Sequence, residues 1–412
     1  MSTFSISVAG MLANEEALGI ISNNLSNMNT VGFKTESPEF SDLVYQQVGS
    51  SGGGNPVQVG LGTTIGATST NFTEGSIQST GVPTDIALQG AGFLQVQKGG
   101  LTLYTRDGNL TVNAQGYLTT QDGGQVMGYG ATNGVVQSSG TLQPLAIDST
   151  QTQPAKATQN VNIGLNLDAS TPLGGSFSTT AQVFDSLGTS HLLTYTFTNT
   201  GSNAWSYQIS IPAADVGQTG NPVVINSGNL AFNGNGDLTS PSSNVTGIKV
   251  TGLADGASAM NFAWNLYNSN GSSIITQVAG SSTANSVQQD GYASGSLASF
   301  SIGQDGTIQG TFTNGQTSAV GQIALATFPN TQGLLHVGSN DYMSSLASGL
   351  PAIGAPGTGG RGSITDGALE NSNVDIASQF AQLITAQNGY QSDSKAFTTF
   401  NTVIQDTFNL IP

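Results

Sequence analysis

The sequence contains no cysteine and only two histidines, and both shortages remove classes of chemistry. Without cysteine there is no disulfide, no thiolate nucleophile and no cysteine-ligated zinc. His191 and His336 lie far apart, each in an apolar strand-like run, where a packed or surface histidine is the better interpretation. No Gly-x-Ser-x-Gly elbow or phosphate-binding Gly-Lys-Ser/Thr loop occurs. We therefore expect no enzyme.

Two further possibilities stay open at this point. Sequence alone leaves open an acid pair of the kind used in glycoside hydrolysis, although several aspartates precede glycine and indicate turns. The segment 233–237 begins like a calcium loop. Leu238 then stands where glycine is needed, and Asn244 where a bidentate glutamate is needed. We expect a turn there, and neither a cofactor nor a metal.

Positive charge is scarce: seven lysines and arginines face 23 acidic residues, for a formal net charge of −16. No basic cluster is present to neutralise the phosphates of a nucleic acid or the surface of an anionic membrane. Because the acidic residues are scattered, their charge indicates solubility and mutual repulsion. We expect neither nucleic acid nor a membrane as a partner.

Long hydrophobic runs are also missing, since no stretch approaches the ~20 apolar residues that span a bilayer. The first twenty residues carry no lysine or arginine, and Glu15 and Glu16 interrupt any apolar segment. A cleaved secretory signal peptide is therefore not expected. The composition is typical of an extracellular protein, so export would need another route.

Only 7% of residues are charged, whereas glycine reaches 56 residues and hydrophobic residues 37%. Such a composition suits β-rich domains with many tight turns, and the periodic apolar residues argue against disorder. Short alternating runs predict strands, and Asp107-Gly108, Gln115-Gly116 and Asp305-Gly306 predict hairpin turns. The fold class is predicted as α+β, mainly β. Helices at the two ends pair as a coiled coil, with nested discontinuous β domains between them.

Breaks in composition divide the chain in a nested way. Gly-rich segments occupy 49–56 and 351–362, and polar, strand-poor segments occupy 148–159 and 280–291. Both chain ends are therefore expected to return to one place. Four parts are predicted: a helical domain of 1–34 plus 368–412, a linker region of 35–75 plus 351–367, a β domain of 76–150 plus 290–350, and an inserted outer β domain of 151–289.

The two ends carry helical seams. From Ile376 a four–three spacing runs to Ile411, and eight of its eleven positions are apolar. Ser372 and Asp375 are predicted to form a capping box before this helix. Gly32 is where the N-terminal helix would stop. The predicted seam residues are Phe4, Met11, Leu18, Ile21, Leu25, Met28, Ile376, Phe380, Leu383, Tyr390, Phe397, Ile404 and Phe408.

Neither helix is expected to be stable alone, because isolated helices are marginal in water. Gly10, Ala13, Ala17 and Gly19 are expected to let a partner helix approach closely. The two helices are expected to pair within one molecule, and this pairing need not exclude contacts with neighbouring subunits. A bare pair would leave apolar rows uncovered at Leu12, Ile20, Ile364 and Val403, which favours further association.

The residues around both helices resemble a known family. The segment 23–34 (NNLSNMNTVGFK) and the segments 367–375 (GALENSNVD), 384–387 and 389–391 are similar to the terminal signatures of bacterial flagellar rod and hook proteins. The β regions at 72–75, 85–93 and 104–118 also resemble the family, whereas Leu94 and Asn388 depart from its pattern. The signature residues are Asn23, Asn24, Leu25, Asn27, Thr30, Gly32, Phe33, Lys34, Leu369, Glu370, Ser372, Asn373, Val374 and Asp375.

The resemblance implies a structural subunit that polymerises into a curved, flexible tube joining the flagellar rod to the filament. Its length and inserted domain favour a hook role over that of the distal rod or hook–filament junction proteins. The implied partners are further copies of itself, rod subunits, the hook cap, the junction proteins and the type III export apparatus. Candidate hinges, from their Gly-rich context, are Gly52, Gly53, Gly54, Gly357, Gly359 and Gly360. An extracellular β-rich adhesin is the rival from another class.

Overall fold

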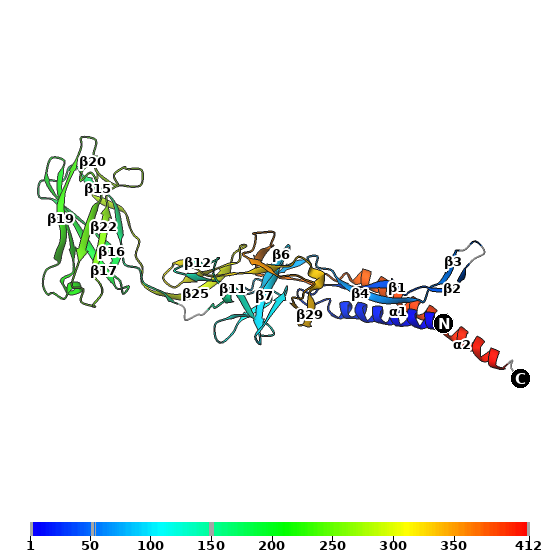
Figure 1. Ribbon diagram of the computed structural model, residues 1–412. Helices are drawn as coiled ribbons and strands as arrows, with labels where there is room; N and C mark the ends of the chain where they lie inside the picture. Colours follow the sequence, from blue (N-terminus) through cyan, green and yellow to red (C-terminus); the bar gives the residue numbers. More distant parts are fainter. Residues whose placement is uncertain (1–2, 51–52, 54, 148–151, 410–412) are drawn as a thin grey trace. The chain divides into compact units, whose positions relative to one another are not determined.

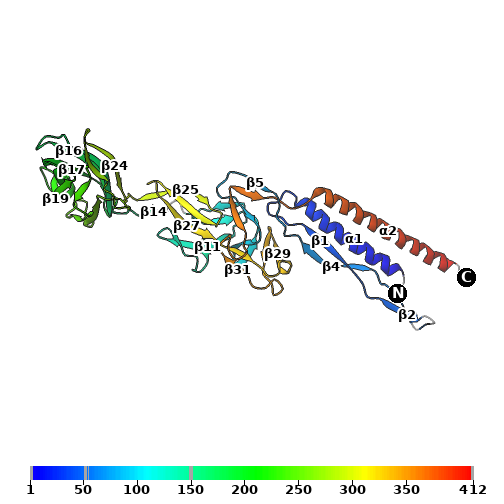
Figure 2. The same cartoon turned by 90° about the horizontal axis from the view of Figure 1, so that it is seen from above.

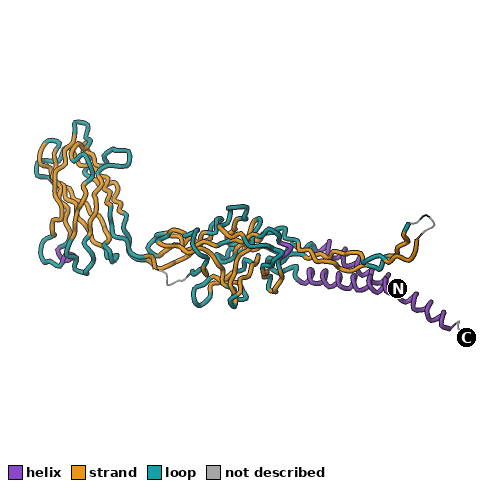
Figure 3. The backbone as a smooth tube through the Cα atoms, viewed as in Figure 1, coloured by secondary structure: helices purple, strands orange, loops and turns teal. Residues whose placement is uncertain are grey.

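A computed structural model describes residues 3–50, 53, 55–147 and 152–409. The chain divides into two compact units. The terminal unit comprises Met1–Asp148, Ser299–Gly310 and Thr317–Pro412, and the inserted unit comprises Ser149–Ala298 and Thr311–Gln316. Strands dominate, with long helices only towards the two ends of the described chain (Figure 3). The predicted fold class is thereby confirmed.

The terminal unit brings the two ends of the chain together. Helix α1 (Thr3–Ser26) lies antiparallel beside α2 (Ile376–Asn409), and α2 extends beyond the start of α1 (Figure 1). The prediction that Met28 belongs to the helical seam is wrong, because α1 ends at Ser26 and the chain turns away. Gly32, with φ of +69°, sits where a Cβ would meet the Arg106 carbonyl oxygen at 2.8 Å.

Small residues line much of the buried face of α1, and the expected close approach at Gly10, Ala13 and Ala17 is confirmed, whereas Gly19 is exposed. Because small side chains let two backbones approach closely, they occupy the contact with α2. A Cβ on Gly10 would lie 2.4 Å from a carboxylate oxygen of Asp393. Of the predicted seam in α1, Ile21 is buried, and Met11, Leu18 and Leu25 are half-buried. The side chain of Phe4 lies outside the described residues. The buried face consists of Ser7, Gly10, Ala13, Ala17, Ile21 and Asn24.

A long β-hairpin accompanies α1 (Figure 2). Its paired strands are β1 (Glu36–Asp42) and β4 (Thr63–Thr70), and β2 (Gln46–Ser50) and β3 (Pro56–Val59) form a second hairpin between them. A hinge between domains is therefore not supported at 49–56, because the chain returns on the paired strand. Gly53 lies in the turn, and Gly52 and Gly54 lie outside the described residues.

The second Gly-rich segment also lies between paired strands. Gly357, Gly359 and Gly360 lie in a turn between β31 (Ala352–Gly354) and β32 (Ser363–Asp366), and both strands pair within the terminal unit. The turn is closed by a hydrogen bond from Gly357 N to Gly362 O at 2.8 Å. The Arg361 guanidinium also donates to Ala355 O at 3.1 Å.

The rest of the terminal unit is a β region whose main path is β27-β11-β7-β8-β30-β29. Its aromatic cluster includes Phe93, Tyr104 and Tyr342. Ile364, predicted to be uncovered on a helix, is fully buried in β32. The strands on this path are β27 (Thr317–Ile323), β11 (Gln125–Thr132), β7 (Phe93–Lys98), β8 (Leu101–Thr105), β30 (Asp341–Met343) and β29 (Leu335–Gly338).

Shorter strands complete this region. A predicted turn is confirmed at Gln115-Gly116, between β9 and β10. The one at Asp107-Gly108 is not a hairpin, because β8 pairs with β7 and β30 instead. These strands are β5 (Ile77–Ser79), β6 (Ile86–Gln89), β9 (Leu110–Val112), β10 (Leu118–Thr120), β12 (Val135–Val136), β13 (Gln143–Pro144), β28 (Leu325–Thr327) and β33 (Ala368–Glu370), with a short helix η2 (Thr331–Gly333).

Two of the boundaries between the units fall inside β25 (Gly295–Ile302) and β26 (Thr307–Phe312), which are joined by the predicted Asp305-Gly306 turn. At its start the inserted unit pairs β14 (Thr152–Gln153) with the first residues of β25. The remainder of the inserted unit folds as two five-stranded sheets.

One sheet of the inserted unit has the order β21-β22-β15-β23, with β24 also paired to β15, and the other has the order β16-β17-β18-β19-β20. A single apolar core joins them, with Trp205 and Trp264 fully buried. The strands are β15 (Asn160–Asp168), β16 (Ser176–Phe184), β17 (Ser190–Gly201), β18 (Ala204–Ile211), β19 (Val223–Phe232), β20 (Leu238–Ser240), β21 (Val245–Val250), β22 (Met260–Asn265), β23 (Ile275–Val278) and β24 (Thr283–Gln289), and η1 (Ala213–Val216) follows β18. The segment 233–237 is the expected turn, with Gly236 N bonded to Asn233 O.

Candidate assembly surface

A buried network of ion pairs joins the N-terminal signature, 23–34, to the C-terminal signature, 367–375. The Lys34 ammonium donates to Glu370 Oε1 at 2.5 Å, and both side chains are fully buried. Arg106 lies 3.4 Å from the other carboxylate oxygen of Glu370. Lys34 also donates to Thr73 O at 2.8 Å, and the carboxylate accepts from Gly75 N at 2.9 Å. One carboxylate therefore serves two cations from distant parts of the chain.

Burial decides the electrostatics of this network. It lowers the pKa of the Lys34 ammonium, against the opposite effect of its hydrogen bond to Glu370. Arg106 is held by further bonds to the carbonyl oxygens of Gly92, at 3.1 Å, and of Gly90. Desolvated charges are tolerable only when paired and hydrogen-bonded, and these contacts supply that condition.

A second polar contact locks α1 to α2. Asn24 is fully buried in the last turns of α1, and its amide donates to Gln379 Oε1 at 3.0 Å. The same side chain exchanges two hydrogen bonds with the backbone of Glu36, at 2.7 and 3.0 Å. Asn24 therefore fixes α2, α1 and the start of β1 to one another.

Asn373 plays the same part on the C-terminal side. Its carbonyl oxygen accepts from both the backbone and the hydroxyl of Thr35, at 2.8 and 2.7 Å. Its amide donates to the backbone oxygens of Asn71 and Thr73. The segment that follows α1 is thereby tied to the segment that precedes α2.

The remaining signature residues shape the two helix ends. Asn27 donates to Asn23 O at 2.9 Å and accepts from the Thr30 hydroxyl at 3.1 Å, which builds the turn after α1. Asp375 caps α2, since its carboxylate accepts from Ser378 N at 3.1 Å. The predicted capping box does not form. Ser372 lies three residues before Asp375, the residue that caps α2, and its hydroxyl accepts from Val374 N instead.

Apolar side chains on α2 stay uncovered within the described chain. Ala386 and Gln379 are buried against α1, and Leu383 and Tyr390 are half-buried, as is Phe397. Every side chain from 401 to 409 is exposed. The exposed predicted seam residues, with their exposed fractions, are Ile376 (46%), Phe380 (51%), Ile404 (41%) and Phe408 (70%).

A groove runs beside this surface between the helices and β1. Its volume is about 410 Å³, and Ala17, Ile21, Phe40, Ala381 and Ala386 are among its lining residues. Phe40 stays half exposed at its edge. The face of the helical pair is therefore apolar and open, in a chain whose surface is otherwise dominated by uncharged polar residues.

Four family descriptions match successive parts of the chain. They are "Flagella basal body rod protein" at 4–34, "Flagellar hook protein FlgE/F/G D1 domain" at 87–166, "Flagellar basal body protein FlaE D2 domain" at 166–292 and "Flagellar basal body rod FlgEFG protein C-terminal" at 365–410. The flagellar hook protein FlgE of Treponema pallidum is 33% identical, over 98% of each chain. That of Salmonella typhimurium is also 33% identical, over 99% of this chain and all of the relative.

The chain belongs to the flagellar hook protein family. Its place is therefore the flagellar hook, as a structural subunit. The crystal structure of Helicobacter pylori flagellar hook protein FlgE2 shares the fold, with a TM-score of 0.51 at 16% identity, covering 71% of this chain and all of that one. No helix among the described residues is long and apolar enough to cross a membrane.

Sequence reasoning found Lys34 and Glu370 but missed their partner Arg106, as well as Gln379. The signal for Arg106 was present, because it lies in the segment 104–118 that resembles the family. Gln379 gave no signal, because a glutamine in an amphipathic helix is ordinarily assigned to solvent.

Proposed function

We propose that this chain polymerises into a curved, flexible tube that joins the flagellar rod to the filament and transmits torque. The observation that carries the proposal is the row of exposed apolar residues along α2, from Ile376 to Phe408. An interface that repeats from copy to copy without closing generates an open helical polymer. In that polymer the helical pair lines the inner tube, and the row on α2 is covered by neighbouring copies.

The predicted four-part division remains our proposal for how the tube is layered: helical part inside, linker region and β domain around it, and inserted domain outermost. The role is structural, without catalysis. The partners are further copies of the chain, rod subunits, the hook cap and the hook–filament junction proteins. We further propose export through the flagellar type III apparatus without a cleaved signal peptide, to an extracellular position.

The test is polymerisation of the purified full chain, followed by negative-stain electron microscopy. We expect curved tubes at high salt from the unaltered chain. Phe380→Ser and Phe408→Ser should raise the concentration needed for assembly, because each deletes an exposed apolar contact. Leu187→Ser is the matched control, since Leu187 is 61% exposed but belongs to the inserted unit and not to either helix. Equal assembly of all four proteins would contradict the proposal.

This experiment and the phenotype of cells lacking the protein separate the alternatives. A monomer that never polymerises and binds glycans would support an adhesin. A distal rod or hook–filament junction role would show in cells lacking the protein: rods without hooks indicate the hook, whereas complete hooks without filaments indicate a junction protein.

A further inference from the structure

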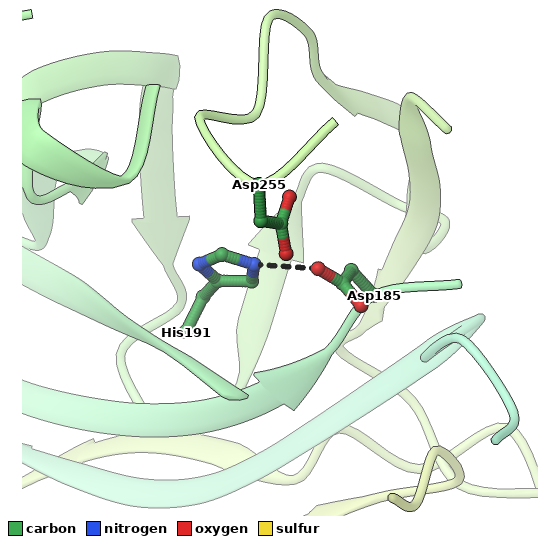
Figure 4. A group of neighbouring side chains, drawn as sticks. All are labelled: Asp185, His191 and Asp255. Carbon is green, nitrogen blue, oxygen red and sulfur yellow. Dashed lines mark hydrogen bonds and ion pairs between the residues drawn. The ribbon is translucent and has the colours of Figure 1, made fainter. Parts of the chain in front are cut away.

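The single histidine of the inserted unit lies at the meeting point of three of that unit's aspartates. His191, at the start of β17, is 4% exposed, and its Nε2 lies 3.1 Å from Asp185 Oδ2. Its Nδ1 lies 3.0 Å from Asp215 Oδ2, on η1. Asp255 approaches from the loop before β22, and one ligand atom from each of Asp185, His191 and Asp255 lies within 4.8 Å of the others. Figure 4 shows both carboxylates facing the same ring nitrogen.

The charges at this point are not balanced by the protein. Residues 149–298 contain only two basic residues, Lys156 and Lys249, and Lys156 pairs with Asp290. Among the described residues, no lysine or arginine forms an ion pair with Asp185, Asp215 or Asp255. Three carboxyl groups therefore surround one imidazole, without a described lysine or arginine paired to any of them.

Backbone contacts hold two of the three aspartates in place. Asp185 is fully buried, and its Oδ1 accepts from Leu187 N at 2.8 Å and from Thr189 N at 3.0 Å. This leaves Oδ2 for the shared space. The Asp255 carboxylate accepts from Ala257 N at 3.1 Å through its Oδ1.

We propose that Asp185, His191 and Asp255 bind one divalent transition-metal ion of the Zn²⁺ class. An imidazole nitrogen and two carboxylate oxygens are suitable ligands for zinc, and water completes the coordination. Asp215 is the positioning residue: its carboxylate accepts a hydrogen bond from Nδ1–H of His191, which leaves Nε2 as the metal-binding nitrogen. The ion clips together the loop after β16, the start of β17 and the loop before β22. Its role is structural and goes beyond the proposed polymer.

The experiment is titration of tag-free, chelator-treated full chain with ZnCl₂ by calorimetry, and with CoCl₂ by visible absorption. We expect one saturable equivalent, and a rise in the melting temperature of the inserted unit with Zn²⁺. Asp255→Asn should weaken binding at least tenfold while preserving the metal-free fold, because Asp255 is exposed. Asp215→Asn should weaken it about 10- to 100-fold by releasing the ring.

His336→Gln is the matched control. It removes the other histidine, which lies in the terminal unit with its side chain 43% exposed and one acid, Glu36, at 3.5 Å. The affinity of the His336→Gln variant for Zn²⁺ should equal that of the unaltered chain. Absence of a saturable equivalent, or unchanged binding by Asp255→Asn, would overturn the proposal. Equal affinity for Ca²⁺ would overturn the assignment to a transition metal, since imidazole adds little to calcium binding.

Discussion

Replacement of Glu370 by glutamine tests how much the buried ion network contributes. The substitution keeps the shape of the side chain but removes the charge that faces Lys34 at 2.5 Å and Arg106 at 3.4 Å. All three side chains are at most 4% exposed, so water cannot compensate. Removing one partner of a buried pair costs about 3–5 kcal/mol, because it leaves an uncompensated charge.

The assay is differential scanning calorimetry of the full chain. At about 2–4 °C per kcal/mol for a unit of this size, the melting temperature of the terminal unit should fall by about 6–20 °C. The transition of the inserted unit is an internal reference, since it contains none of these residues. Lys34→Met combined with Glu370→Gln should lose less than the sum of the two single variants, because they share one contact.

An exposed ion pair provides the control. Lys156 and Asp290 lie 3.7 Å apart with side chains 44% and 31% exposed. Such pairs contribute about 0–1 kcal/mol, so Lys156→Met should change neither transition by more than a few degrees. The reasoning is refuted if Glu370→Gln melts within 1 °C of the unaltered chain, or if its loss is no larger than that of Lys156→Met.

Three further predictions concern the terminal unit. Ala17→Leu should destabilise the packing of α1 on α2 by about 1–3 kcal/mol and speed amide exchange along α1, because Ala17 is 1% exposed; unchanged exchange would contradict this. Gly108→Ala should lower the melting temperature strongly, because a Cβ there would lie 1.7 Å from Ile86 O, whereas Gly49→Ala, in open space, should not. Burial and the neighbouring Asp122 raise the pKa of Asp341 to about 7, so the folded state retains a proton that the unfolded state releases near pH 4. The contribution of this proton to the free energy of unfolding, at most about 4 kcal/mol, is present below about pH 4 and is lost as pH rises to about 7. Asp341→Asn should therefore flatten the decline in melting temperature between pH 5 and 8. A decline identical to that of the unaltered chain would exclude this role.

The sequence predicted the existence of both helices because their apolar periodicity persists over several turns. It also predicted the small residues at the close approach, but it assigned Met11, Leu18 and Leu25 to the seam, where they are only half-buried. In the structure, Gly10, Ala13 and Ala17 form the contact because close approach of two backbones requires small side chains. The large residues of α2 are instead the exposed ones.

Motif reasoning was more accurate for Asn24, Lys34, Glu370 and Asn373 than periodicity was for the seam. Resemblance grouped these residues, but only the fold shows why they belong together: each makes a contact across more than three hundred residues of chain. The Gly-rich segments could not be placed from sequence, because glycine serves a tight turn and a flexible joint equally well. Strand pairing on both sides places them in turns, and pairing is a long-range property.

The exposed end of α2 links folding of the chain to its assembly. The first half of the helix is held by Gln379 and Ala386, whereas residues 401–409 have every side chain exposed. A helical segment as short as 401–409 is marginal in water on its own, so little within the described chain stabilises the end of α2. Burying Ile404 and Phe408 against neighbouring copies would contribute roughly 1.5–3 kcal/mol each. Ordering of this segment and polymerisation are then one equilibrium, whose position depends on subunit concentration. Assembly is therefore expected to stabilise the end of α2, which the described part of the single chain leaves without a covering surface.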